Sequence, residues 1–332
     1  MTNDLPPELE PDSGPLASRG SGRHADTVFR GLVTAAGVSV LLVLGLMIAS
    51  TTADAWPVFV KEGFGFLTGR QWKPGPSRTE ITGTYGALPF IYGTITTSVI
   101  ALTLALPLSI GVALYLSEVA PRSVRRPLSY AVELLAAVPS VVYGLWGVLF
   151  FIPIVLLPLM RMLSASLGGW LPILAGPPTG FSHLSAGTVL AIMVLPIITA
   201  IIREVFTAVP QAERDAAYAL GATRWEVMRH VVLPRTTSGI VGASMLGLGR
   251  ALGETIAVAL LIGSAASIDV SVMRPGYSMA ALIANTFQES SPEGVQALVA
   301  IGVALFVITI VVNAAARFVV WKVGNPPAVV SP

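Results

Sequence analysis

The sequence predicts an all-α integral membrane protein with six transmembrane helices, and two observations carry that prediction. Hydrophobic residues make up 54% of the 332 residues and charged residues only 11%, less than half of the roughly 25% that soluble domains carry. The apolar residues are also gathered into stretches of about 20 residues or more, the length that crosses a bilayer. Because lipid offers no partner to a free backbone amide, such stretches must be helical.

The predicted spans differ in how regular they are. The third contains Pro139, Pro153 and Pro158, so we expect kinks or a break within it. The segment 159–183 that follows is apolar but interrupted by glycine and proline, and we expect it to be an external loop at the membrane interface. In chain order, the six predicted spans are 29–53, 88–117, 128–158, 185–209, 237–264 and 296–320.

Basic residues are distributed unequally between the two sides of these spans. Thirteen of the 20 Lys and Arg residues fall in the N-terminal tail, the second and fourth loops and the C-terminal end. Six fall in the other loops, and Arg250 lies within a span. The positive-inside rule then places both termini in the cytoplasm. This bias accounts for the basic balance of the chain without a nucleic-acid partner.

The chain divides into a membrane domain and two tails. Residues 1–27 are rich in Pro, Ser, Gly and charge, so we expect a disordered cytoplasmic tail. The membrane domain is predicted at 28–322 and a short C-terminal tail at 323–332. The chain has no cysteine and three widely separated histidines. We therefore expect neither a disulfide framework nor a metal site.

The loop 209–235, between the fourth and fifth spans, carries strong helix signals. Good helix formers run from Gln211 to Leu220, and Gly221 is placed to end that helix in the left-handed conformation. Thr223 and Glu226 have the spacing of a capping box, which starts a second short helix. With Pro234 closing the unit, we predict a compact helix–turn–helix on the cytoplasmic face. The alternative is a solvated linker.

The same loop resembles the motif of permease subunits of ABC importers. In that family the loop is a coupling helix, here about 213–224, that docks in a groove of the ATPase subunit. Two positions depart from the motif, because Asp215 replaces the usual glutamate and Val231 the usual isoleucine. The residues assigned to ATPase coupling by this resemblance are Glu213, Asp215, Ala216, Ala217, Gly221, Leu233 and Pro234.

The chain itself has no sequence that fits a P-loop, and it contains no Gly-Lys pair. We therefore expect no catalytic residue and no cofactor in this chain. A partner ATPase must supply ATP hydrolysis, with its ATP and Mg²⁺. The resemblance implies a permease of the ABC importer type I class.

Three further stretches narrow the resemblance: YGALPFIYGTI at 85–95, ELLAAVPSVVYGLWG at 133–147 and GRALGETIAV at 249–258. Together with the loop they resemble the permeases of phosphate-specific ABC importers, most closely the PstC type, over roughly residues 60–320. The resemblance implies a bacterial cytoplasmic-membrane location. It also implies a PstA-type permease as heterodimer partner, two PstB-type ATPase subunits and an external PstS-type binding protein. A phosphate-sensing regulator is a further expected partner.

Arg250 and Glu254 are the candidate residues of the substrate path that this resemblance implies. Their i, i+4 spacing puts both on one face of a continuous helix, and Gly249 with Gly253 forms a GxxxG suited to a close helix neighbour. Arginine matches phosphate oxygens with a planar fork. The alternatives are a structural ion pair and an arginine that snorkels to the interface. Glu254 would either hold Arg250 in place or accept a hydrogen bond from the P–OH of hydrogen phosphate.

Neutral donors complete the predicted path. Ser140, Tyr143 and Thr255 are candidates, with helix packing as the alternative for each. Glu133 is expected to bridge to Arg125 or Arg126. The sequence thus predicts a permease subunit that moves phosphate by alternating access. The alternatives are a permease for another oxyanion such as sulfate or molybdate, an ATP-independent transporter or channel, and a scaffold that relays phosphate status.

Overall fold

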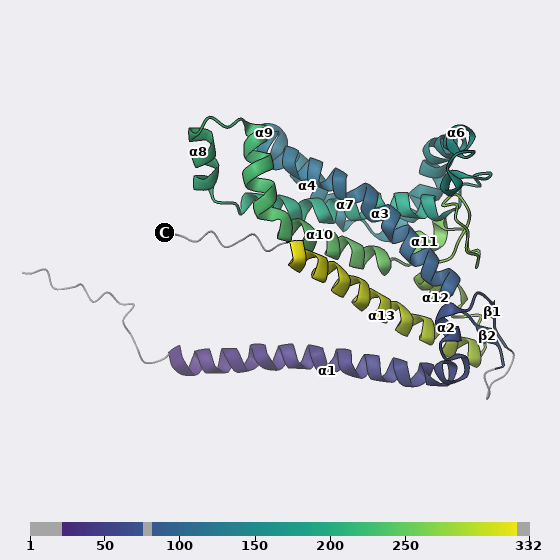
Figure 1. Cartoon of the computed structure of the whole chain (residues 1–332). Helices are drawn as coiled ribbons and strands as arrows, with labels where there is room; N and C mark the ends of the chain where they lie inside the picture. Colours follow the sequence, from purple (N-terminus) through teal and green to yellow (C-terminus); the bar gives the residue numbers. More distant parts are fainter. Residues whose placement is uncertain (1–21, 76–81, 324–332) are drawn as a thin grey trace, which may run out of the picture. The chain divides into compact units, whose positions relative to one another are not determined.

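The computed structural model describes residues 22–75 and 82–323, and helices dominate them (Figure 1). Six helical segments are long and apolar enough to cross a membrane, which confirms the predicted number. The strands among the described residues form one short antiparallel hairpin, β1 (Trp72–Lys73) with β2 (Thr84–Tyr85), in which Trp72 lies opposite Tyr85. The all-α prediction is therefore confirmed.

The chain falls into two compact units, Met1–Thr51 and Thr52–Pro332. Helix α1 (Gly22–Glu62) contains the first span, at Asp26–Glu62. Because α1 begins at Gly22, the end of the predicted tail 1–27 is helical, and residues 1–21 lie outside the described residues. Helix α13 (Pro292–Val323) ends where the predicted C-terminal tail begins, and 324–332 also lie outside them.

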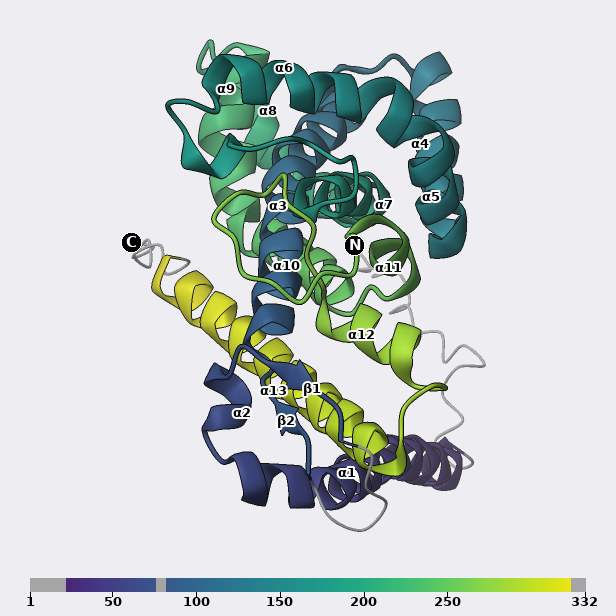
Figure 2. The same ribbon diagram turned by 90° about the vertical axis from the view of Figure 1, so that its right-hand side faces the viewer.

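The core of the second unit is built on α3 (Leu88–Leu114) and α7 (His183–Thr207), which pack side by side (Figure 2). Small residues allow this close approach. A Cβ on Gly187 would lie 2.6 Å from Ile100 of α3, and the Ser109 hydroxyl donates to the Leu195 carbonyl at 3.1 Å. Two thirds of the α7 span is buried, so α7 is the central helix.

The third predicted span is divided at Pro139. Helix α4 (Arg122–Ala137) ends just before it. After it follow α5 (Ser140–Trp146), the π-helix η3 (Gly147–Leu156) and α6 (Leu157–Leu167). The expected break is confirmed, but the apolar span lies at 140–167 rather than 128–158. The prediction of a loop from 159 was wrong, because Pro158 stands in the first turn of α6, where a proline is tolerated.

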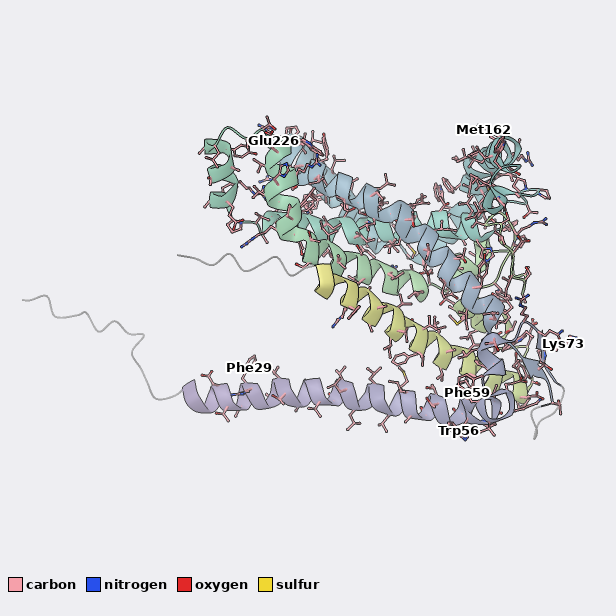
Figure 3. All side chains as sticks on the ribbon, in the orientation of Figure 1. Phe29, Trp56, Phe59, Lys73, Met162 and Glu226 are labelled. Atoms are coloured by element: carbon pink, nitrogen blue, oxygen red, sulfur yellow. The ribbon has the colours of Figure 1, made fainter. Side chains whose placement is uncertain are left out.

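The remaining elements complete the two ends of the second unit. The π-helix η2 (Tyr115–Val119) ends α3, and the 3₁₀ turn η4 (Pro172–Leu174) follows α6. Helices α2 (Gly65–Thr68) and α12 (Met279–Thr286) lie near the hairpin (Figures 1 and 2). Glu226 marks one end of the unit, while Met162 and Lys73 lie toward the other (Figure 3). We call the Glu226 end the coupling end.

Candidate functional site

The coupling loop folds as two short helices joined by a tight turn. Helix α8 (Gln211–Ala219) ends at Gly221, whose φ of 86° is left-handed. The Gly221 and Ala222 amides donate back to Tyr218 and Ala217 at 2.9 and 3.1 Å, which closes the helix end. The predicted role of Gly221 as a helix terminator is confirmed.

The predicted capping box is also present. Helix α9 (Arg224–Val227) starts after Thr223, whose amide donates to the Glu226 carboxylate at 2.7 Å. In return, the Glu226 amide donates to the Thr223 hydroxyl at 3.4 Å. Together these bonds satisfy two amides that a helix start leaves free.

Pro234 does not close the unit, so that prediction was wrong. The helix that begins at α9 continues through the π-helix η5 (Met228–Val232) into α10 (Leu233–Leu252). Proline lacks the amide that a helix interior needs and clashes with the preceding turn. The wider turn directly before Pro234 accommodates that conflict. The coupling loop is thus joined to the fifth span by one unbroken helical run.

Arg214 anchors the loop to the core. Its side chain is 10% exposed and forms an ion pair with Glu118 of η2. It also donates to the Phe206 carbonyl, near the end of α7, at 2.5 Å. One guanidinium therefore ties α8 to the ends of both core helices. An exposed pair, Arg235 with Glu213 at 3.2 Å, links α8 to α10.

The outer face of the loop is exposed. Asp215 accepts a hydrogen bond from the side-chain amide of Gln211 at 2.9 Å. Asp215 and Ala216 are both exposed to solvent. Leu220 is 90% exposed and Trp225 is 64% exposed. Ala217 and Leu233 instead pack against the core, while Pro234 is exposed. An apolar tip of this kind on an ordered loop is typical of a protein-binding surface.

The helix that carries Arg250 stops two residues after it. Helix α10 ends at Leu252, and α11 (Ile256–Leu261) begins after a break at Gly253–Thr255. The Glu254 carboxylate accepts the Ala257 amide at 3.3 Å, and the Thr255 hydroxyl donates to the Gly253 carbonyl at 3.2 Å. A free N-terminus for α11, with a carboxylate to cap it, competes with continuation of α10.

One prediction about this region was wrong, and a second is not met within this chain. Arg250 and Glu254 do not share one helix face, because Glu254 stands in the break, and no ion pair joins them. Among the described residues no helix packs on the Gly249–Gly253 pair, since a Cβ on Gly249 would meet nothing within 4 Å. The break was not predicted, because the residues on both sides of GRALGET continue the helical pattern.

Arg250 lines a large cavity between α7, α10 and α13. The cavity has a volume of about 1060 Å³, and its wall includes Ile197 of α7, Gly242 and Met245 of α10 and Ala314 of α13. Within the described part of the chain the guanidinium of Arg250 forms no hydrogen bond or ion pair. Arginine without a carboxylate partner beside a cavity is suited to binding an anion.

The other predicted path residues lie elsewhere. Tyr143 is buried and donates to the Leu135 carbonyl at 2.8 Å, within electrostatic range of Arg250. Ser140 stands half-buried at the start of α5. Glu254, Thr255, Ser140 and Tyr143 are not in the described wall of the cavity. Three polar wall residues, Ser238, Asn313 and Arg317, were missed, although the polar pair Asn313 and Arg317 interrupts an apolar span.

Other ionisable groups connect structural elements to one another and do not line the cavity. Glu133 pairs with Arg203 at 2.9 Å instead of the expected Arg125 or Arg126, and Arg125 donates to the Ser117 carbonyl. At the other end of the unit, buried Glu293 accepts the Gly83 amide at 2.6 Å and the Tyr85 hydroxyl at 2.9 Å. Burial, together with this carboxylate, raises the pKa of Tyr85 to about 12.

Residues 105–324 match the model of the family described as binding-protein-dependent transport system inner membrane component. The chain belongs to this family. It is 43% identical over 302 residues to the phosphate transport system permease protein PstC of Mesorhizobium japonicum, covering 90% of each chain. The PstC of Xylella fastidiosa is 42% identical and covers 98% of this chain and 99% of its own. The predicted resemblance to PstC-type permeases is therefore confirmed.

Solved structures support the same fold. A bacterial alginate ABC transporter chain matches with a TM-score of 0.59 at 16% identity, covering 91% of this chain and 98% of the other. The MetNI methionine ABC transporter, in a structure described as inward facing, matches at 0.52 with 16% identity, over 71% of this chain and 97% of the other. This permease is thus a multi-pass membrane protein with an ABC importer fold.

Proposed function

We propose that this chain is the membrane-spanning permease subunit of an ATP-driven inorganic phosphate importer that works by alternating access. The observation that carries the proposal is the PstC-type sequence, about 40% identical over nearly the whole chain, combined with Arg250 in a cavity of about 1060 Å³. At neutral pH phosphate is present as its mono- and dianion, and a guanidinium fork matches two of its oxygens. Sulfate and molybdate share that geometry and are the main alternatives.

The coupling end is the proposed ATPase docking surface and lies in the cytoplasm, with both termini. The exposed side chains of Leu220 and Trp225, beside Asp215 and Ala216, offer an apolar and acidic tip to a groove. Two PstB-type ATPases would bind there and on a PstA-type partner permease. ATP and Mg²⁺ belong to those ATPases. A PstS-type protein would deliver phosphate at the opposite end.

The connections in the loop suggest how ATP binding reaches the path. Arg214 holds α8 against the ends of α3 and α7. The run from Arg224 to Leu252 carries displacement of the loop directly to Arg250. The break at Gly253–Thr255 then lets α10 turn without dragging α11. Arg250, at the hinge, would change the side of the membrane to which it is open.

Uptake of labelled phosphate tests this proposal. The chain is expressed with its partner subunits in a cell that lacks its own phosphate importer. Arg250→Gln should reduce uptake by at least about tenfold, the effect of losing one charge-assisted contact, while assembly with the ATPase is unchanged. Arg250→Lys is the matched control, since it keeps the charge but not the fork, and should retain partial uptake.

Three results would redirect the proposal. Normal uptake in Arg250→Gln would mean that Arg250 is not part of the phosphate path, while the family assignment would still hold. Stronger inhibition of uptake by sulfate or molybdate than by unlabelled phosphate would favour another oxyanion. Uptake that persists without the ATPase partner would favour a transporter or channel that works without ATP.

A further inference from the structure

The face of α13 that lines the cavity is polar at its coupling end. Ile310, Asn313, Ala314 and Arg317 follow one another at i, i+3, i+4 and i+7 and all stand in the cavity wall, as residues on one helix face do. They lie in the last span, whose other residues are almost all apolar. The side-chain amide of Asn313 and the guanidinium of Arg317 point to a functional role, because placing such groups in a membrane costs free energy.

Arg317 and Arg250 lie toward opposite ends of the cavity. Helix α10 runs away from the coupling end, and α13 runs back toward it (Figure 1). Arg250 stands in the last turn of α10, while Ser238, also in the wall, is twelve residues earlier, about 18 Å along the axis at 1.5 Å per residue. The C-terminal end of α13, with Arg317, lies on the Ser238 side.

The cavity wall is positively charged. Its described residues include two arginines and no carboxylate. Neither guanidinium forms an ion pair or a hydrogen bond with a described residue. Asn313, four residues before Arg317 on the same face of α13, and Ser238 of α10 offer neutral donors in the same wall. Without a carboxylate among the described wall residues, the compensating charge must come from a ligand, from the solution or from the partner permease.

We infer that Arg317, with Asn313 and Ser238, forms a second anion position that accepts a phosphate-type oxyanion from Arg250 before its release at the coupling end. The inference rests on the proposed function for the identity of the anion. Two weak positions in series suit transport, because each can be filled and emptied where one tight site would trap the anion. A phosphate-type oxyanion reaches Arg317 either as free phosphate or on a lipid headgroup, and the test separates them.

The first test is the transport rate of the whole complex in proteoliposomes. Arg317→Gln should lower the maximal rate by about tenfold, the loss expected for one charge-assisted contact. The phosphate concentration at half-saturation should change little, since uptake begins at the other end. Arg317→Lys should restore most of the rate. If both variants match wild type while Arg250→Gln is inactive, the second position is overturned and the proposed function survives.

The second test reports occupancy directly and uses the absence of cysteine from this chain. Ala314→Cys places a thiol in the cavity wall next to the proposed position. Val311→Cys is the matched control, on the same helix but 58% exposed and outside the wall. Each single-cysteine chain is assembled with cysteine-free partners, and a charged thiol reagent is applied from the coupling side with and without inorganic phosphate.

Phosphate should slow modification of Ala314→Cys several-fold, about the occupancy change expected of a millimolar site. Protection should be lost when Arg317→Gln is added, and Val311→Cys should show none. If the oxyanion is a lipid headgroup, Ala314→Cys is protected without added phosphate, and protection varies with the vesicle lipid. Equal modification with and without phosphate in every lipid would contradict the inference. If the wild-type complex imports no phosphate, the proposed function itself is contradicted.

Discussion

The coupling loop and the break after α10 lie at the two ends of one helical run, and they are held in different ways. At the loop, the turn at Gly221, the capping box at Thr223 and the buried Arg214 all fix the backbone. At the break, the hydrogen bonds are local: the Glu254 carboxylate accepts the Ala257 amide, the Thr255 hydroxyl donates to the Gly253 carbonyl, and the Gly253 and Glu254 amides donate back into the last turn of α10. None of these bonds reaches another packed helix of the core, and neighbouring Arg250 forms no hydrogen bond or ion pair with a described residue.

This difference matches the two tasks of the permease. A loop that receives force from an ATPase must move as a body, so its bonds link it to both core helices. A hinge must yield at small cost, and its hydrogen bonds are local ones, each worth about 1 kcal/mol, that do not tie it to a core helix. The rigid region and the yielding region are therefore joined by one helical run, and α10 carries the movement of the first to the second.

The largest expected effect comes from breaking the anchor of the rigid region. Arg214→Met leaves Glu118 unpaired in a site where both side chains are mostly buried, 10% and 16% exposed. Removing one partner of a buried pair costs about 3–5 kcal/mol. Thermal unfolding of the purified complex should therefore shift to lower temperature, and capture of the ATPase on a tagged permease should weaken.

A matched control lies in the same loop. Arg235→Met breaks the Arg235–Glu213 pair, whose side chains are 60% and 37% exposed. Such a pair is worth about 0–1 kcal/mol, so this variant should melt and bind the ATPase as wild type does. An equal loss in both variants would mean that charge on the loop, rather than the buried anchor, holds the ATPase.

A smaller effect is expected from two glycines, Gly221 in the loop and Gly249 in the last turn of α10, just before the break. Gly221→Ala forces a side chain into a left-handed φ of 86°, which costs about 1–2 kcal/mol. Gly249→Ala adds a methyl that meets nothing within 4 Å in a helical turn, so it should be neutral for the fold. Binding-protein-stimulated ATPase activity and the melting temperature should fall in the first variant and hold in the second. If Gly221→Ala keeps the ATPase activity and melting temperature of wild type, the turn at Gly221 does not contribute to the rigidity of the loop.

The two regions also differ in how far the sequence could predict them. The loop follows from local chemistry, since Gly221, Thr223 and Glu226 act on backbone groups a few residues away. Its continuation past Pro234 did not follow, because a π-helix depends on the whole run. The break at Gly253 depends on α11 packing against α5 and α7, contacts that spacing does not reveal. Arg317 is one of the basic residues at the C-terminal end to which the positive-inside rule applies, and only the antiparallel course of α13 brings it into the cavity of Arg250.

The smallest change in stability, and the finest test of the yielding region, is Glu254→Gln. Glutamine still offers an oxygen to the Ala257 amide, so assembly should stay as in wild type. The variant removes the negative charge that repels sulfate and introduces an NH2 donor that suits a sulfate oxygen, whereas glutamate accepts only from the P–OH proton, which sulfate lacks at neutral pH. Sulfate enclosed in reconstituted vesicles, on the coupling side, should then slow phosphate uptake in Glu254→Gln and leave wild type unaffected.

Glu254→Ala separates the two roles of this carboxylate. Alanine removes both the charge and the acceptor for Ala257, so α11 should fray and uptake should fall even without sulfate. If enclosed sulfate affects Glu254→Gln and wild type equally, Glu254 serves the hinge alone. Selectivity would then rest on the binding protein and the two arginines. A sulfate effect confined to Glu254→Gln would place anion discrimination at the hinge itself, where a change of access and a check on the substrate's proton occur together.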